Sequence, residues 1–158
     1  MEVTELFRQG LGLEAPWRVA SVSLDLEKNR LDIVVDFPAG SMFPCPMCKT
    51  LCKAYDTDER EWRHLNFFQY LTYLRAWQPR VDCSTHGKKT VTVPWSREGS
   101  HFTLLFEGMV VELARNGLTV NALARIVGEH DTRLWRVLEF PLFVRIGEGR
   151  FMLPSSAA

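Results

Sequence analysis

Cys45-Pro46-Met47-Cys48 and Cys83-Ser84-Thr85-His86 are the two stretches that decide how the first part of this chain folds. Each places two metal-ligating side chains on one tight turn, and the segment 49–82 between them has room for a β-hairpin. Four cysteine and histidine ligands with no open position are typical of a closed, structural zinc site. The histidine favours zinc over iron, and the sulfur favours zinc over magnesium. The sequence therefore predicts one structural Zn²⁺ held by Cys45, Cys48, Cys83 and His86.

Other side chains near these pairs leave alternatives open. Cys52 follows Cys48 closely and could compete as a ligand, although a small buried side chain is its more usual role. His64 lies in an apolar stretch, where a histidine is more often packed or hydrogen-bonded than metal-bound, and His101 and His130 stand at expected helix starts. A thiol redox enzyme using Cys45 and Cys48 is a further alternative, which tight zinc binding that resists mild oxidant would exclude.

Composition is that of a soluble globular protein. The chain has 158 residues, of which 46% are hydrophobic and 24% charged, so a core can form. It lacks the run of about 18 apolar residues that a membrane span needs, and its acidic start, Met1–Glu5, lacks the features of a secretory signal. We therefore expect a cytoplasmic protein with reduced thiols, no disulfide framework and no membrane partner.

The first two thirds of the chain show the patterns of β-structure. Alternating apolar and polar residues predict an antiparallel hairpin within 22–37, preceded by a short helix over 2–10. The aromatic-rich segment 61–82 predicts two further strands separated near Phe68–Tyr70, and 89–93 predicts a short third strand.

Helical spacing replaces this alternation after Pro94-Trp95-Ser96. Apolar residues predict a helix over 102–115, and Thr119 is the expected N-cap of a short second helix that ends at Gly128. Asp131 or Thr132 then caps a third helix.

Residues 118–138 have the arrangement of a helix-turn-helix, with two short helices and a glycine in the turn. The first residues of the second helix would face DNA base edges, where an arginine can read guanine through two hydrogen bonds. Small three-helix units without DNA-binding function share this pattern. Within the second helix, the spacing of Trp135 from Leu134 and Leu138 predicts that it is packed in the core. The expected DNA contacts from this unit are Thr119, His130, Thr132, Arg133 and Arg136.

Charge is unevenly distributed although the formal net charge is zero. Residues 60–97 carry seven basic and two acidic side chains. Clustered lysine and arginine can displace counterions from DNA phosphates, and the alternative is a solvated face of mixed sign. The expected phosphate contacts are Arg63, Arg75, Arg80, Lys88, Lys89 and Arg97.

The ordered set of motifs resembles the N-terminal half of bacterial insertion-sequence transposases of the ISL3 type. The matching stretches are Cys45–Cys48, Trp62–Leu65, Pro79–Gly87, Val93–Ser96, Phe102–Glu107 and Gly128–Arg136. Such transposases carry an N-terminal zinc finger, a helix-turn-helix and then an acidic-triad catalytic domain. The resemblance implies that Cys83 and His86 form the second half of the zinc finger. It stops near Leu138, so we expect the catalytic carboxylates to be absent.

These observations predict an α+β fold in three parts. A small β-rich, zinc-ribbon-like lobe with an N-terminal β-hairpin covers 1–97, a three-helix helix-turn-helix unit covers 98–139, and 140–158 forms an irregular or disordered tail. Acidic residues on the predicted hairpin and in a predicted loop at 56–59 show no sign of converging on a metal pair, so the chain is not expected to be an enzyme.

The expected function is the DNA-binding portion of a transposase that recognises the terminal inverted repeats of a mobile element. Its partner would be double-stranded DNA in the bacterial cytoplasm, in association with the nucleoid, and no small-molecule substrate is expected. The alternative is a truncated regulatory module that forms a homodimer, with the aromatic-rich stretch 62–77 as its interface, and represses transposition.

Overall fold

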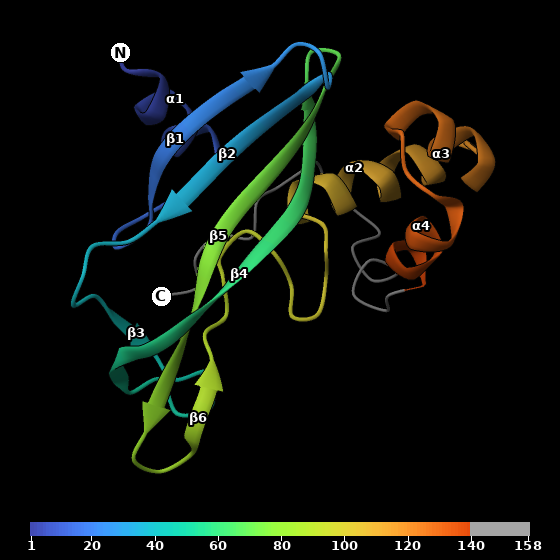
Figure 1. Ribbon diagram of the computed structural model, residues 1–158. Helices are drawn as coiled ribbons and strands as arrows, with labels where there is room; N and C mark the ends of the chain where they lie inside the picture. The colour runs from blue at the N-terminus through green and yellow to red at the C-terminus, as the bar shows by residue number, and fades with distance from the viewer. Residues whose placement is uncertain (140–158) are drawn as a thin grey trace.

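One mixed sheet forms the centre of the molecule (Figure 1). The structure, a computed structural model, describes residues 1–139, and the tail predicted for 140–158 lies outside them. Five strands of the sheet lie in the order β1 (Arg18–Asp25), β2 (Arg30–Asp36), β5 (Tyr70–Cys83), β4 (Leu51–Phe67) and β3 (Met42–Pro44). A further strand, β6 (Gly87–Thr90), pairs with β5 beyond the metal-ligand pair Cys83 and His86.

The two predicted hairpins are present and lie side by side. β1 pairs with β2, and β4 pairs with β5 through a turn at Phe68, whose backbone is left-handed with φ 53°. The hairpins join through β2 and β5, which run parallel. Sequence periodicity carries no information about this pairing, because residues 30–35 meet residues 71–76 only through tertiary packing.

The alternation of apolar and polar residues sets which side of the sheet is buried. Leu31, Ile33 and Val35 are at most 2% exposed, while the residues between them face the other side. Three tryptophans complete this core, with Trp95 edge-on to both Trp17 at 4.8 Å and Trp62 at 5.4 Å between ring centroids. Such edge-to-face contacts add to the gain from burying apolar surface.

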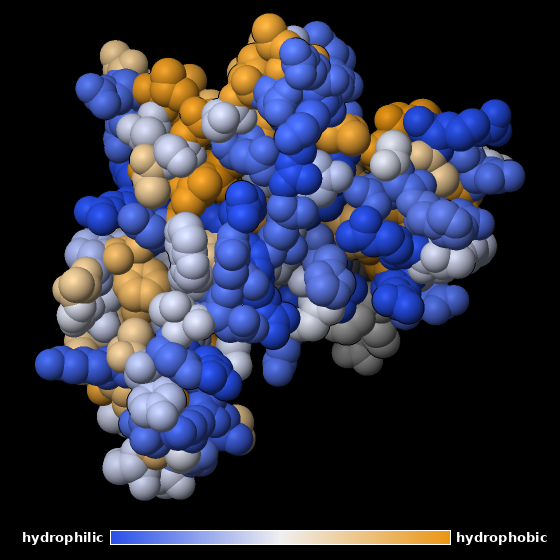
Figure 2. All heavy atoms as spheres, viewed as in Figure 1, coloured by the Kyte–Doolittle hydropathy of each residue, from blue (hydrophilic) through white to orange (hydrophobic). Residues whose placement is uncertain are grey.

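Strand β4 is much longer than expected and includes the acidic segment predicted to be a loop. Asp56 pairs with Arg80 and Glu59 with Arg75, both on β5. Arg80 lies directly across from Asp56, while Arg75 reaches Glu59 diagonally. Opposite charges on neighbouring strands stabilise a strand that has few apolar residues, so the loop prediction for 56–59 was wrong. Figure 2 shows the resulting hydrophilic surface across the middle of the molecule, with apolar groups gathered near the hairpin turns.

Four helices are described in residues 1–139. α1 (Val3–Gly10) contacts β1, and α2 (Leu104–Arg115), α3 (Val120–Val127) and α4 (Asp131–Leu138) form a unit beside β4 (Figure 1). The Thr119 side chain accepts a hydrogen bond from the Ala122 amide, and Gly128 ends α3 in the left-handed conformation. The bounds of α3 therefore follow the predicted cap and stop. The cap predicted for the next helix was wrong, because His130 rather than Asp131 or Thr132 is the N-cap residue of α4, and its side chain accepts from the Thr132 amide. The α+β class is confirmed. None of the described helices combines the length and apolar character needed to cross a membrane.

Candidate metal centre and nucleic-acid interface

The four predicted zinc ligands come together at one end of the sheet. The ligand atoms of Cys45, Cys48, Cys83 and His86 all lie within 4.8 Å of one another. The Sγ atoms of Cys48 and Cys83 are 3.7 Å apart, and His86 Nδ1 lies 3.7 Å from Cys83 Sγ and 3.8 Å from Cys45 Sγ. A tetrahedron with metal–sulfur bonds of about 2.3 Å has edges of about 3.8 Å. The separations therefore fit a tetrahedral zinc ion.

Strand pairing explains why side chains so far apart in sequence meet here. Cys45 directly follows β3, which pairs with the start of β4, while Cys83 ends β5, which pairs with the same strand β4. The first turn is closed by a hydrogen bond from the Lys49 amide to the Cys45 carbonyl at 2.8 Å. In the second, Gly87 adopts a φ of 68°, which suits glycine. We call residues 42–57 and 78–90, which surround these ligands, the zinc lobe.

Hydrogen bonds prepare the thiols for metal binding. The backbone amides of Thr85 and His86 donate to Cys83 and, with the His86 ring, lower the pKa of its thiol to about 6. The pKa of Cys48 is lowered chiefly by the side chain of Thr50. Zinc binds the thiolate rather than the thiol, so both shifts favour the form that a zinc ion requires.

The alternative ligands considered from the sequence have other surroundings. Cys52 is outside the four-residue cluster, and burial raises the pKa of its thiol. The Nδ1 atom of His64 lies 2.8 Å from the Thr103 hydroxyl oxygen, as expected for a hydrogen-bonded strand histidine. His101 and Arg133 line a cleft that residues 58–63 of β4 also border.

The environment of His64 predicts a dependence of stability on pH. The Thr103 hydroxyl accepts a hydrogen bond from the Phe106 amide and can donate its own hydrogen to a neutral His64 ring. Burial, with a smaller contribution from Arg63, lowers the pKa of His64 from 6.5 to about 4. Between these values the unfolded chain binds a proton that the folded protein does not. Stability should therefore fall as pH drops from 6.5 to 4, by up to about 3 kcal/mol from this group.

Urea unfolding of wild type and of His64→Gln across this pH range measures the effect. Protonation of the zinc ligands is common to both proteins, so the difference between their curves isolates His64. Parallel curves would show that the buried ring does not contribute.

The helix-turn-helix has its own core. Buried residues of α2, α3 and α4 pack against one another in this core. They include Phe106, Val110, Leu123, Val127, Leu134 and Val137. In α4, Leu134 and Val137 point inward, which leaves Thr132, Trp135 and Arg136 on the opposite face. Trp135 is 49% exposed, so the prediction that it lies in the core was wrong. One face of α4 is buried against α2 and α3, and Leu134 and Val137 occupy that face. Trp135 therefore lies on the exposed face.

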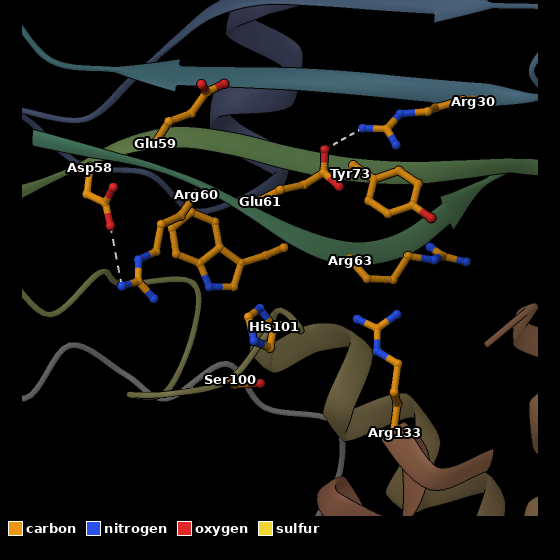
Figure 3. Close-up of a pocket in the computed structure, with 11 residues that line it drawn as sticks. Arg30, Asp58, Glu59, Arg60, Glu61, Arg63, Tyr73, Ser100, His101 and Arg133 are labelled. Atoms are coloured by element: carbon orange, nitrogen blue, oxygen red, sulfur yellow. Dashed lines mark hydrogen bonds and ion pairs between the residues drawn. The ribbon is translucent and has the colours of Figure 1, made fainter. Parts of the chain in front are cut away.

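Arg133 points elsewhere. Its guanidinium lies over the Phe102 ring, 4.7 Å from the centroid, and forms an ion pair with Glu129. Figure 3 shows Arg133 directed toward β4, in a cleft of about 560 Å³ that Arg63 and His101 also line. In this structure Arg133 therefore does not project from α4 with Thr132 and Arg136.

Arg63 cannot be the phosphate contact that its position in the basic segment predicted. Its side chain is 1% exposed, because β4 places it beneath the helical unit. The guanidinium donates to the Val127 carbonyl at 2.9 Å and faces the carboxylate of Glu129. This prediction is corrected: Arg63 is an internal residue.

The other basic side chains lie on several elements, and Arg80 and Lys88 both lie near the Asp56 carboxylate. Arg75 and Arg80 are exposed on β5 in ion pairs with Glu59 and Asp56. Lys88 donates to the Tyr55 hydroxyl at 3.0 Å, next to Lys89 on β6. Arg97 binds the fully buried carboxylate of Glu107 at 3.0 Å, which indicates a structural role.

Two family models match separate parts of the chain. Residues 42–86 match a family model described as the zinc-finger of transposase IS204/IS1001/IS1096/IS1165, and residues 91–140 match one described as the helix-turn-helix domain of transposase family ISL3. Transposases for insertion sequence element IS1557 from two Mycobacterium tuberculosis strains, CDC 1551 / Oshkosh and ATCC 25618 / H37Rv, are similar to the chain. Each is 34% identical over 116 residues, which cover 65% of this chain and 26% of the relative.

The chain thus matches about a quarter of the length of these curated relatives. No solved structure matches it.

Proposed function

Because the chain carries the zinc finger and the helix-turn-helix of an ISL3-type transposase, we propose that it recognises the terminal inverted repeats of a mobile element. The observation that carries this proposal is the exposed face of α4, which belongs to a matched helix-turn-helix and presents Trp135 and Arg136, both exposed among residues 1–139. One structural Zn²⁺ at the four-residue cluster would hold the zinc lobe in shape.

The outer face of α4 suits the DNA major groove. Arg136 can reach guanine, Thr132 can reach a base or a phosphate, and Trp135 can pack against thymine methyl groups. His130 and Thr119 stand at the N-termini of α4 and α3, where phosphates are favoured. Arg133 could reach DNA after leaving Glu129. From the zinc lobe, Arg80, Lys88 and Lys89 are candidates for phosphate contacts.

We infer that this chain has no catalytic step of its own. Asp32 and Asp36 are held by Arg30 and Arg18 on the sheet. Among residues 1–139, the group of side chains placed to hold a metal consists of cysteines and a histidine, whereas two-metal DNA cleavage needs converging carboxylates. Cleavage would then belong to a catalytic domain of the kind that the longer relatives have room for.

Dimerisation through residues 62–77 is less well supported. Trp62 and Leu74 are at most 3% exposed in the core of the sheet, whereas Phe68 is 78% and Trp77 43% exposed. Part of this stretch is therefore unavailable to a partner, and its exposed aromatic residues lie near the hairpin turn and on β5. A cytoplasmic, nucleoid-associated protein that contacts double-stranded DNA is the reading we propose.

Binding to short duplexes tests this function. Zinc-loaded protein should prefer the ends of the element over random duplex, and its affinity should fall steeply between about 50 and 200 mM salt. Equal affinity for both duplexes at moderate salt would overturn the proposal.

Trp135→Ala tests the orientation of α4. If Trp135 packs on a thymine methyl, the variant should bind the element end about 1–2 kcal/mol more weakly. Replacing that thymine with uracil, which lacks only the methyl group, should weaken wild type and leave the variant unaffected. Ile126→Ala is the control, since Ile126 is a 59% exposed apolar residue on α3. If no thymine-to-uracil change discriminates between the two proteins, Trp135 does not read a methyl group.

A further inference from the structure

A buried carboxylate lies between the sheet and the helix-turn-helix. Glu129, in the turn between α3 and α4, has a side chain only 5% exposed. Its Oε1 atom lies 3.2 Å from Arg63 Nε on β4, and its Oε2 atom accepts from Arg133 on α4. Figure 3 shows the Arg133 guanidinium directed toward the Arg63 side chain on β4. Two like charges would repel in this position, so the carboxylate of Glu129 is what holds them together.

Arg63 also reaches several other elements. Its guanidinium donates to the Val127 carbonyl, at the end of α3, and to the Thr72 carbonyl of β5 at 3.3 Å. The same group lies 5.2 Å from the Phe106 ring centroid of α2 and 5.6 Å from that of Tyr73. One side chain thus contacts the sheet, α2 and the α3–α4 turn.

The backbone around Arg63 continues this attachment. The Arg63 amide donates to the His101 carbonyl at 2.9 Å, and the Thr103 amide donates to the Arg63 carbonyl at 3.0 Å. The chain entering α2 is therefore hydrogen-bonded to the edge of β4 at the same residue that receives the α3–α4 turn.

Buried ion pairs differ from apolar contacts in what they specify. Removing two charges from water is costly, and the attraction compensates only when geometry and further hydrogen bonds are nearly ideal. Apolar side chains of similar size can often replace such a pair without loss of stability, whereas in some proteins the buried polar group is what fixes one arrangement of the parts. Arg63 and Glu129 face each other at 3.2 Å at the junction of the two parts of the protein, where the Arg63 guanidinium also donates to the Val127 and Thr72 carbonyls.

We propose that Arg63 and Glu129 are positioning residues, which fix the helix-turn-helix on the sheet so that the zinc lobe and α4 meet one DNA duplex in a single relative orientation. The part concerning DNA rests on the proposed function, whereas the fixed orientation does not. A consequence is that the two parts would contact DNA segments at one fixed spacing.

Residual dipolar couplings of backbone amides in the zinc-loaded chain test the orientation. In wild type, one alignment tensor should fit both the sheet and helices α2–α4. In Arg63→Met/Glu129→Met, each part should fold but require its own tensor. The matched control is Arg80→Met/Asp56→Met, which removes an exposed ion pair on the same sheet and should keep the single tensor.

A single tensor in the buried-pair variant would overturn the proposal. Chemical-shift dispersion and zinc content report whether that variant folds. If it does not, Glu129→Gln decides, because it keeps the shape of the side chain and removes only its charge. The proposal then requires separate tensors in Glu129→Gln.

DNA spacing provides the second readout. Inserting 5 base pairs between the segments protected by the zinc lobe and by α4 turns them to opposite sides of the helix and should weaken wild-type binding about tenfold or more. The double variant should bind the uninterrupted site more weakly but lose much less on insertion. Equal losses would show that the pair does not set the spacing. If wild type shows no sequence preference, the proposed function is refuted. The fixed orientation is then tested by the residual dipolar couplings alone.

Discussion

Cys83→Ala is expected to abolish stoichiometric zinc binding and to unfold the zinc lobe. Cys83 is 2% exposed, ends β5 and lies within contact distance of both Cys48 and His86. Structural zinc contributes about 10–16 kcal/mol of apparent binding free energy in zinc-finger peptides at pH 7. A whole domain is stabilised by only about 5–15 kcal/mol, so the loss of one ligand can exceed the entire stability of this lobe.

Cys52→Ala is the matched control, because Cys52 is a nearby cysteine outside the ligand cluster. Native mass spectrometry and thermal unfolding should show one zinc and near-normal stability for Cys52→Ala. If Cys83→Ala still bound zinc with unchanged stability, the ligand assignment would be wrong. Zinc loss in Cys52→Ala would instead reveal Cys52 as a ligand.

Phe106→Ala is expected to destabilise the helical unit by about 3–5 kcal/mol. The Phe106 ring is fully buried and stacks on Phe102 at 4.7 Å between centroids. It also lies beneath the guanidinium of Arg63, so its removal opens a cavity where α2 meets β4. Hydrogen exchange should show the amides of α2–α4 losing protection while those of the zinc lobe keep theirs.

Ile126→Ala provides the comparison within the same unit. The Ile126 side chain is 59% exposed, and surface substitutions of this kind usually change stability by no more than about 0.5 kcal/mol. Similar losses for Phe106→Ala and Ile126→Ala in urea unfolding would contradict the position assigned to the Phe106 ring.

Features that depend on a few neighbouring residues could be predicted from the sequence. Thr119 caps α3 and Gly128 ends it, because a hydroxyl near a free amide and a residue without a Cβ act within one turn. The first hairpin follows from alternation between residues 22 and 37 in the same way. The short strand predicted over 89–93 lies earlier in the chain, because β6 begins at Gly87 and ends at Thr90.

Features that depend on distant parts of the chain could not be predicted in this way. The basic segment contains Arg63, Arg75 and Arg80 at similar polar positions. The structure buries only the first of these three, because the helical unit covers that point of β4. Trp135 was misplaced for the converse reason: its spacing from Leu134 and Leu138 fits two different helix faces, and the packing of α4 on α2 and α3 selects one.

The sequence by itself determined the four ligand residues, the hairpins, the caps of α3 and the class of the fold. These are set by side-chain chemistry and by interactions spanning a few residues. Only the tertiary structure decided which charges are internal, that β2 and β5 run parallel, and that Glu129 bridges Arg63 and Arg133. The reason is physical: an arginine or a tryptophan can lie inside or outside, and partners far along the chain decide which costs less free energy.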